Sequence, residues 1–360
     1  MRSLKNYMNI LIIKPSSMGD IIQANPTAVA IKKIFPDSRV SWLVFDMWSA
    51  IPALFPDVDE IIVWRRKGGI REYLRVIREV RKKSFDIVID LQGLLRSAVI
   101  ARFSGAPTVI GVPGMKEGSW MLVKESAPAW RSFNAVWRSL ETVRHAAAPG
   151  GISTIDDVGV VDMNDLRKIF HIEVPVTAQE EVASLLREHG IGSSDAVIGI
   201  VPTARGKAKQ WPSSSYVALI EMLQKKHVHV KIVLLDSAAT ALTYPLSNAV
   251  IDLGGVLTLH QLAAVLRRCS VVVGGDTGPM HLAAALGMPV VMMFGGSDVA
   301  ETAPLSPLAT ILNKEFPCSP CRGAADCRVK GKKSKKKEHY PCLEAITPRE
   351  VFEAIEKWIH

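Results

Sequence analysis

Short apolar runs alternate with amphipathic stretches along the first half of the chain. The runs are rich in β-branched and other apolar residues and are bounded by polar or turn-forming residues, which is typical of buried β-strands. The predicted strands are Ile10–Ile13, Val40–Phe45, Glu60–Trp64, Phe85–Asp90 and Thr108–Gly111. Because helical spacing fills most of the segments between them, this rhythm predicts a parallel sheet with helical crossovers.

The rhythm returns in the second half, after a less regular stretch at 113–165 and a helical segment, Val176–His189. The strands predicted there are Ala196–Val201, Val228–Leu235, Val250–Leu253, Val271–Gly274 and Pro289–Phe294. The chain therefore reads as α/β, with two Rossmann-like doubly wound domains in tandem. We place the domains at 1–175 and 176–345, followed by a closing helix, 346–360, that is a candidate to pack back on the N-terminal domain.

One predicted helix, over 71–83, has a strongly basic face. Apolar residues recur at helical spacing on one side: Leu74, Ile77 and Val80. Basic residues share the opposite side: Arg71, Arg75, Arg78 and Lys82. That side is either a solvated helix face or a surface that binds an anion.

Composition and charge narrow the class of protein. The chain has 360 residues, of which 48% are hydrophobic and 22% charged, which is typical of a soluble globular protein with room for two cores. Lys14 and Asp20 interrupt the first apolar run well short of the roughly 20 residues of a membrane span, so we expect a cytoplasmic protein without a signal peptide. The formal net charge of +9 favours an anionic partner: a nucleic acid, a membrane surface or a phosphorylated substrate.

The loop after the first strand carries a candidate catalytic carboxylate. In doubly wound folds, ligands bind beyond the carboxyl ends of the strands, so the loops at those ends are the first place to look for chemistry. The first loop reads Lys-Pro-Ser-Ser-Met-Gly-Asp at 14–20. Asp20 is open to two interpretations: an N-cap of the next helix, or a general base for an acceptor hydroxyl.

A basic loop follows the first strand of the second half. It reads Pro-Thr-Ala-Arg-Gly-Lys-Ala-Lys-Gln-Trp-Pro at 202–212 and offers the hydroxyl of Thr203 and the ammonium group of Lys209. Cations beside backbone amides at a strand end suit a diphosphate. The alternative is a solvated basic loop.

The third loop, Gly-Gly-Asp-Thr-Gly-Pro at 274–279, is the most specific of the three. Asp276 and Thr277 turn the chain, and Gly278 opens a helix whose first amides suit an anion. His281 lies near the start of that helix, where a lone histidine is more often structural than a ligand. A Gly-x-Gly-x-x-Gly after the first strand, a P-loop and a Gly-x-Ser-x-Gly elbow are all absent from the sequence, which argues against a nicotinamide enzyme, a P-loop ATPase and an α/β hydrolase.

Together and in this order, these segments resemble family 9 glycosyltransferases, the bacterial lipopolysaccharide heptosyltransferases. The opening "ILIIKPSSMGDIIQANPTAVAIKKIFPDSRVSWLV" is similar to the start of the type I enzymes, and "FDIVIDLQGLLRSAVIARFSGAP" is similar to the family's Asp-x-Gln-Gly segment. "AKQWP" and "GGDTGPMHLAAALGMPVV" are similar to its two donor-site motifs. The resemblance runs from about Ile10 to the closing "ITPREVFEAI" and so covers nearly the whole chain.

The resemblance implies a GT-B fold, with two domains facing across a cleft that holds the active site, and neither a catalytic metal nor a cofactor. The N-terminal domain would bind the acceptor, Kdo-lipid A, at the inner face of the cytoplasmic membrane, and the C-terminal domain the donor, ADP-heptose. The implied reaction is inverting transfer of L-glycero-D-manno-heptose to the Kdo region of the lipopolysaccharide inner core. Asp20 matches the family's general base.

Further residues match the family's substrate sites. Lys209 matches the lysine that meets the donor phosphates, Thr203 would add a hydroxyl to them, and Asp276, Thr277 and Gly278 match residues that hold the heptose and the diphosphate. The role of His281 stays open. Segments similar to those that meet the acceptor's carboxylates and phosphates contain Arg65, Arg66 and Arg96, whose guanidinium groups pair well with both kinds of anion.

The sequence departs from the family pattern in two places. The stretch "DSAATALTYPLSN" stands where a Gly-Gly pair and a ribose-binding Glu are usual, and Asp236 is the candidate substitute. A cysteine group resembles that of another subtype and is either a structural metal site or a set of reduced thiols: Cys318, Cys321, Cys327 and Cys342.

Two other functions compete with the one that the resemblance implies. A related glycosyltransferase would add a later heptose or use another nucleotide sugar. A basic nucleic-acid-binding protein would use the cysteine group and the lysine run Lys330–Lys337. We expect no nucleic-acid partner, because no aromatic residues interleave those lysines to stack on bases.

Overall fold

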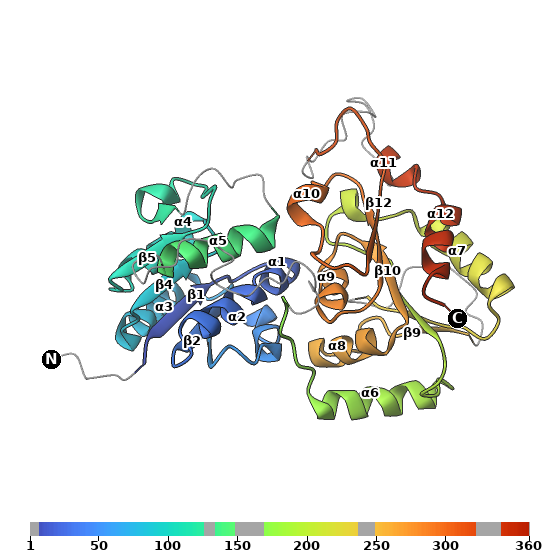
Figure 1. The fold of residues 1–360 in the computed structure, drawn as a ribbon, viewed down its shortest axis with the longest axis horizontal. Helices are drawn as coiled ribbons and strands as arrows, with labels where there is room; N and C mark the ends of the chain where they lie inside the picture. The colour runs from blue at the N-terminus through green and yellow to red at the C-terminus, as the bar shows by residue number, and fades with distance from the viewer. Residues whose placement is uncertain (1–6, 126–133, 148–168, 237–248, 322–339, 360) are drawn as a thin grey trace. The chain divides into compact units, whose positions relative to one another are not determined.

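A computed structural model describes residues 7–125, 134–147, 169–236, 249–321 and 340–359. The chain divides into two compact units, Met1–Glu173 and Val174–His360 (Figure 1). Each unit contains one six-stranded sheet in which all strand pairs are parallel. The predicted α/β class with two doubly wound sheets is therefore confirmed, and the division lies beside the predicted boundary at 175.

The first unit has the strand order β3-β2-β1-β4-β5-β6. Its strands are β1 Asn9–Ile13, β2 Arg39–Phe45, β3 Glu60–Trp64, β4 Ile87–Asp90, β5 Thr108–Gly111 and β6 Lys124–Glu125. Its α-helices are α1 Met18–Gln23, α2 Asn25–Ile34, α3 Gly69–Lys83, α4 Leu95–Phe103 and α5 Ala135–Ala147. Short 3-10 turns are η1 Asp46–Trp48, η2 Pro52–Leu54 and η3 Ser119–Met121.

The second unit repeats this order as β12-β11-β10-β7-β8-β9. Its strands are β7 Val197–Val201, β8 Lys231–Leu234, β9 Val250–Asp252, β10 Val271–Gly275, β11 Val290–Phe294 and β12 Ala309–Asn313. Its helices are α6 Val176–Glu188, η8 Lys207–Lys209, α7 Ser213–Lys226, α8 Leu259–Arg268, α9 Gly278–Ala285, α10 Val299–Thr302, α11 Pro341–Glu344 and α12 Pro348–Glu356.

Both sheets are apolar because helices cover the central strands on both faces. Every residue of β1, β7, β10 and β11 is buried, as expected for parallel strands with covered faces. Fully burying one Val, Leu or Ile side chain contributes about 1.5–3 kcal/mol to folding. The carboxyl ends of these buried strands are therefore held in place, and so are the first residues of the loops that follow them.

Four elements differ from what the sequence predicts. The edge strands β6 and β12 were not predicted, since β6 has two residues and β12 is only partly buried. Helix α5 occupies part of the stretch expected to be less regular, and it buries Val136, Leu140 and Val143 at helical spacing. In α3 the buried apolar residues are Val76 and Val80, while Leu74, expected on the buried side, is 42% exposed.

The closing helix α12 packs in the second unit, against α7 and β11. Its Val351 and Ile355 join the core cluster that holds Trp211, whose indole Nε1 donates to the carbonyl oxygen of Ile346 at 2.9 Å. Packing of 346–360 on the first unit remains a prediction. Within the described residues, no helix is both long and apolar enough to cross a bilayer.

Candidate functional site

The order of strands reverses between β7 and β10 in the second unit. These two strands are neighbours, with Val201 opposite Gly274, although β8 and β9 lie between them in the sequence. Loops that leave adjacent parallel strands at such a switch point diverge and leave a crevice at the sheet edge, which is where ligands bind in doubly wound folds. The two loops here are the basic loop after β7 and the turn from β10 to α9.

Glycines let the basic loop lie directly on the sheet edge. A Cβ at Gly275 would collide with the carbonyl oxygen of Lys209, and one at Gly295 would lie 2.9 Å from the carbonyl oxygen of Ala208. The backbone of η8 therefore passes against the ends of β10 and β11 at a distance that no other residue permits. This close approach places Lys209 beside the residue that follows β10.

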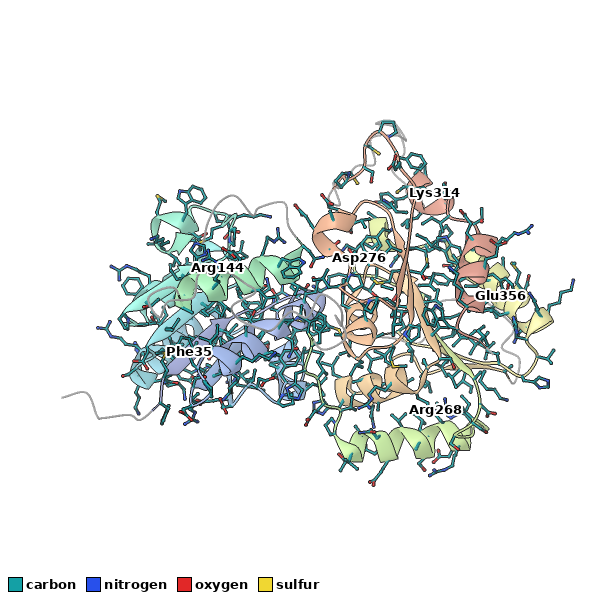
Figure 2. All side chains as sticks on the ribbon, in the orientation of Figure 1. Phe35, Arg144, Arg268, Asp276, Lys314 and Glu356 are labelled. Atoms are coloured by element: carbon teal, nitrogen blue, oxygen red, sulfur yellow. The ribbon has the colours of Figure 1, made fainter. Side chains whose placement is uncertain are left out.

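Three side chains contact the carboxylate of Asp276, the residue that follows β10 and is labelled in Figure 2. Lys209 Nζ lies 2.5 Å from Asp276 Oδ2, and the hydroxyl of Ser297 donates to the same oxygen at 2.6 Å. His281 Nε2 lies 2.9 Å from Asp276 Oδ1. We call Lys209, Asp276, His281 and Ser297 the Asp276 network.

The Asp276 network carries a buried negative charge. Burial alone would raise the pKa of Asp276, but the hydrogen bond from His281 and the nearby charge of Lys209 outweigh it and hold that pKa below its usual range. Asp276 and His281 are 3% and 5% exposed at their side chains, whereas Lys209 is 41% exposed. Lys209 is therefore held by one carboxylate while its ammonium group stays accessible to a second anion.

Two buried polar atoms beside this network have no partner in the described part of the chain: Thr277 Oγ1 and His281 Nδ1. An ionised carboxylate only accepts, so His281 Nε2 carries the proton that Asp276 receives. Thr277 is the N-cap of α9, whose first amides carry the positive end of the helix dipole. A buried, unsatisfied group costs about 1–3 kcal/mol, a cost that a bound polar ligand would remove.

The structure brings together four of the predicted donor-site residues, namely Lys209, Asp276, Thr277 and Gly278. Gly278 is the first residue of α9. Thr203 lies in the loop that carries Lys209, and in the described part of the chain no hydrogen bond joins its hydroxyl to the Asp276 network. Asp276 differs from the expectation in one respect, because its carboxylate already binds three protein side chains.

The first unit has its own switch point, between β1 and β4, where Ile13 lies opposite Asp90. Asp20 is the third residue of α1, and the helix N-cap is Ser17, so the interpretation of Asp20 as the cap itself is wrong. Asp20 Oδ2 accepts from the Ser17 amide at 3.0 Å and from its hydroxyl at 2.5 Å, as in a capping box. The side chain of Asp20 is exposed, so its carboxylate remains reachable from solvent.

Two further ionisable groups, the buried Asp90 and the partly buried Lys14, lie at the ends of β4 and β1. Burial raises the pKa of Asp90 to about 6, although Asp90 accepts from the amides of Gln92 and Gly93 and from the Ser97 hydroxyl. Burial lowers the pKa of Lys14, and the negative charges of Asp20 and Asp90 offset part of that shift. Lys14 Nζ donates to the carbonyl oxygen of Leu91 at 2.8 Å.

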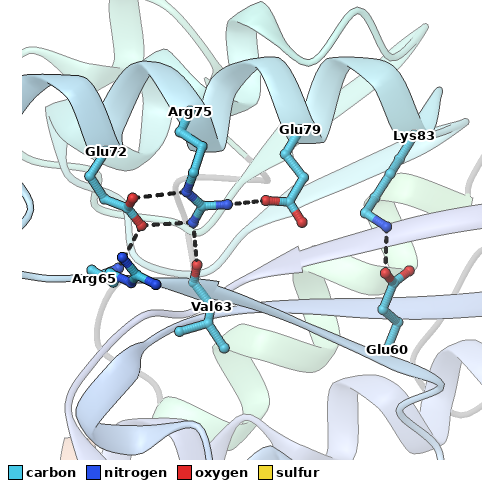
Figure 3. A network of polar contacts seen from close by, with 7 residues as sticks. All are labelled: Glu60, Val63, Arg65, Glu72, Arg75, Glu79 and Lys83. Carbon is cyan, nitrogen blue, oxygen red and sulfur yellow. Dashed lines mark hydrogen bonds and ion pairs between the residues drawn. The ribbon is translucent and has the colours of Figure 1, made fainter.

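The predicted acceptor arginines separate into a pair and a single residue. The guanidinium carbons of Arg66 and Arg96 lie 5.8 and 5.3 Å from the centroid of the Phe45 ring. Arg65 is held by its backbone instead, since its amide donates to Glu72 Oε1 at 3.0 Å (Figure 3). Arg66 and Arg96 thus share one ring, whereas Arg65 contacts Glu72 of α3.

The basic face of α3 is partly neutralised inside the unit. Arg75 binds Glu72 and Glu79 and donates to the carbonyl oxygen of Val63 at 2.7 Å (Figure 3). Hydrogen bonds from Arg75 hold the pKa of Glu72 at about 2, so the pair stays ionised at neutral pH. Arg75 therefore belongs to the fold and is no candidate for an anion site.

The sequence departures fall partly outside the described residues. Cys318 and Cys321 are free thiols, and no group of three His, Cys, Asp or Glu residues that could hold a metal occurs within the described ranges. Cys327, the lysine run 330–337 and most of the stretch that follows Asp236 lie outside the described residues. The expectations for these segments stay predictions.

Sequence reasoning missed several residues of the site. Ser297 follows β11 in Phe-Gly-Gly-Ser-Asp, where a polar residue after a buried strand is the signal that could have identified it. Asp90 carries the same signal at the end of β4. Phe45 carries none, because a buried aromatic residue in a strand reads as core.

Comparison with known proteins gives a consistent result. The model of glycosyltransferase family 9 (heptosyltransferase) matches residues 73–332. Lipopolysaccharide heptosyltransferase 1 of Pseudomonas aeruginosa is 27% identical over 333 residues, covering 87% of this chain and 86% of that protein. Lipooligosaccharide heptosyltransferase 2 of Haemophilus influenzae is 26% identical over 316 residues, covering 85% and 88%.

Solved structures share the fold over nearly the whole chain. A family 9 glycosyl transferase from Veillonella parvula superposes with a TM-score of 0.81 at 20% identity, covering 99% of this chain and 98% of that chain. The E. coli heptosyltransferase WaaC with ADP superposes with a TM-score of 0.71 at 21% identity, covering 98% and 100%. At these identities the likeness concerns the fold.

Proposed function

The chain belongs to glycosyltransferase family 9, and from that premise we propose that it transfers L-glycero-D-manno-heptose from ADP-heptose to the Kdo region of the lipopolysaccharide inner core. The acceptor we propose is Kdo-lipid A at the inner face of the cytoplasmic membrane. The second unit would bind the donor and the first unit the acceptor. The curated relatives named above, which act on lipopolysaccharide or lipooligosaccharide by their names, support this choice.

The observation that carries the donor assignment is the Asp276 network. It holds an accessible ammonium group at a switch-point sheet edge, beside the N-terminus of α9 and two unsatisfied polar atoms. A diphosphate suits this arrangement, since it supplies anionic oxygens to Lys209 and to the hydroxyl of Thr277. The solved relative that holds ADP supports a nucleoside diphosphate as the group bound here.

We propose that Asp20 is the general base. Its exposed carboxylate sits in a fixed position, because the amide and hydroxyl of Ser17 both donate to Oδ2. Each carboxylate oxygen has two lone pairs, so Asp20 retains acceptor capacity for a substrate hydroxyl. This role does not compete with its place in the capping box.

The reaction would then proceed in one displacement. Asp20 takes the proton of a Kdo hydroxyl while the hydroxyl oxygen forms a bond to the anomeric carbon of the heptose. The bond from that carbon to the ADP phosphate oxygen breaks, and the configuration at the carbon inverts. Negative charge grows on the departing diphosphate, where Lys209 stabilises it.

A later heptose addition is the second candidate. The type 2 relative from Haemophilus influenzae is 26% identical, against 27% for the type 1 relative from Pseudomonas aeruginosa. The two candidates differ in the acceptor, which is Kdo-lipid A in the first and an acceptor that already carries heptose in the second. We favour the first because the opening segment resembles the type I enzymes.

The test is ADP release by the purified protein with ADP-heptose and Kdo-lipid A, compared with the same acceptor already carrying one heptose. We expect release only when donor and acceptor are both present, and faster release with Kdo-lipid A. Asp20→Asn can still accept from Ser17 but cannot take a proton, so kcat should fall about 100- to 10,000-fold. Full turnover by Asp20→Asn would remove Asp20 as the base, and no release from either acceptor would overturn the proposed function.

A further inference from the structure

Three aromatic rings lie in a row beneath the predicted acceptor arginines. Phe45 ends β2 and is 2% exposed, and its ring centroid lies 4.8 Å from that of Trp64. Trp64 lies 5.5 Å from Tyr73 of α3 by the same measure. The Tyr73 hydroxyl donates to the carbonyl oxygen of Arg96 at 2.7 Å, so the row of rings also fixes the first turn of α4.

Two guanidinium groups from different elements lie over the ring of Phe45, at one end of this row. Arg66 follows β3 and Arg96 belongs to α4, and their Cζ atoms lie 5.8 and 5.3 Å from the Phe45 centroid. Both distances fall within the roughly 6 Å of a cation–π contact. Two like charges that share one ring repel each other, and an anion bound by both would relieve that repulsion.

The contrast with Arg75 shows what is specific to this pair. Arg75 binds two carboxylates and a backbone carbonyl of its own unit, so its charge is already compensated (Figure 3). The guanidinium groups of Arg66 and Arg96 rest on a ring, which orients them without neutralising them. Arg66 also donates from its amide to Asp46 Oδ1 at 3.3 Å, and its Nη1 lies 3.9 Å from Met47 Sδ. An aromatic platform therefore leaves both charges available for a ligand.

We propose that Phe45 is a positioning residue that holds Arg66 and Arg96 as a clamp for one anionic group of the acceptor. The proposal rests on the proposed function, since the acceptor is the substrate assigned to the first unit. The anion is a carboxylate or a phosphate, because guanidinium forks recognise both. Phe45 itself never touches the acceptor, and its effect passes through the two arginines.

The test is the acceptor KM of Phe45→Leu, measured with ADP-heptose and Kdo-lipid A at two salt concentrations. We expect KM to rise about tenfold with kcat unchanged, because the two cations lose the ring that orients them. The salt dependence of KM should also become shallower. Phe45→Tyr keeps the ring and should restore the wild-type KM.

Phe55→Leu is the matched control. Phe55 is also 2% exposed, but its ring packs edge-on against Trp42 at 5.4 Å. The Phe55→Leu variant should lose about as much stability in urea unfolding as Phe45→Leu does, and its acceptor KM should be unchanged. A KM that rises equally in both Leu variants would overturn the proposal, since it would reflect damage to the core alone.

Arg96→Lys keeps the proposal testable even where Phe45→Leu does not fold. Arg96 is an exposed residue, and lysine keeps its charge but loses the planar guanidinium group. The KM should rise several-fold, and an unchanged KM would overturn the clamp. If the wild type is active and the variants have the same KM as the wild type, the clamp is rejected and the proposed function stands. If the wild type itself releases no ADP, the proposed function is rejected.

A dephosphorylated acceptor identifies the anion. If Arg96→Lys still raises KM on this acceptor, the clamp holds a carboxylate. If the penalty disappears, the clamp holds a phosphate. Either result keeps the clamp, whereas equal KM values for wild type and Arg96→Lys on both acceptors contradict it.

Discussion

Asp90 and Asp276 lie at the carboxyl ends of corresponding strands in the two units, yet the pKa values of their carboxyl groups are shifted in opposite directions. Asp90 is the last residue of β4 and Asp276 follows β10, and each of these is the fourth strand of its sheet, beside the first. Burial raises the pKa of Asp90 to about 6. Burial acts on Asp276 as well, but His281 and Lys209 outweigh it and lower the pKa.

The difference shows that topology sets where a strand end lies, whereas the surrounding side chains set the pKa of a carboxyl group there. The repeated strand order places a carboxylate at each switch point, where doubly wound folds bind ligands. Lys209 Nζ, 2.5 Å from Asp276, helps to hold that carboxylate ionised, whereas at Asp90 burial outweighs the hydrogen bonds from two backbone amides and a hydroxyl and keeps the pKa at about 6. The second unit thus holds a lysine ready for an anion, and the first keeps its arginines on an aromatic ring.

Among the substitutions that test this comparison, removal of the Lys209 ammonium group should have the largest effect on activity. We expect Lys209→Met to lower kcat/KM by about 100- to 1,000-fold, since it removes the charge that stabilises the leaving diphosphate. Steady-state kinetics with ADP-heptose and Kdo-lipid A measures this. Lys207→Met is the control from the same loop, and an equal loss in both variants would show that only the overall charge of the loop matters.

The raised pKa of Asp90 predicts a pH dependence of stability. Its folded-state pKa of about 6 exceeds the ordinary 3.8, so its protonated form contributes stability that is present below about pH 4 and lost as pH rises through 6. Wild type should therefore lose up to about 3 kcal/mol relative to Asp90→Asn between pH 4 and pH 7. Urea unfolding of both proteins across this range measures the difference, and parallel pH curves would contradict the assignment.

Neutralising Asp276 tests whether the network matters while Lys209 remains present. Asp276→Asn loses the charge that holds Lys209, and we expect kcat/KM to fall about 30-fold, equivalent to about 2 kcal/mol. The same kinetic assay measures it. Asp298→Asn is the control, since Asp298 caps α10 and asparagine caps equally well. Unchanged kinetics in Asp276→Asn would mean that Lys209 needs no carboxylate to be positioned.

The smallest expected effect is that of Ser297→Ala. The hydroxyl of Ser297 donates one of the three contacts to Asp276, so its loss should lower kcat/KM by only a few-fold, or about 1 kcal/mol. Thermal unfolding measured alongside separates this from a change in stability. A loss as large as that of Asp276→Asn would show that Ser297 touches the substrate itself.

The sequence predicts the strands of the two sheets well and the environment of single side chains poorly. Apolar runs such as those of β1 and β10 identify buried strands because every residue in them faces a covered side of the sheet. Helix α5 carries a helical pattern with Asn134 before it and Pro149-Gly150-Gly151 after it, signals that the prediction of a less regular stretch did not use. Leu74, expected on the buried side of α3, is exposed, and Val76, which that prediction did not include, is buried.

The candidate site follows the same division. The switch-point rule places the loops of Lys209 and Asp276 at adjacent strand ends, and the resemblance supplies their roles. The close approach of the Lys209 backbone to Gly275 could not be predicted from the sequence, because it depends on how the loop crosses the sheet edge. For the same reason, the stacking of Arg66 and Arg96 on one ring was out of reach, because the three residues come from three elements.

Titration of ADP into wild type, Asp20→Asn and Lys209→Met tests the division of labour between the units most directly. The account predicts that Asp20→Asn binds ADP within about twofold of wild type, because the donor belongs to the second unit. Lys209→Met should bind at least about tenfold more weakly, a loss of about 1.4 kcal/mol. Equal weakening in both variants, or unchanged binding in Lys209→Met, would contradict the assignment of the donor to the Asp276 network.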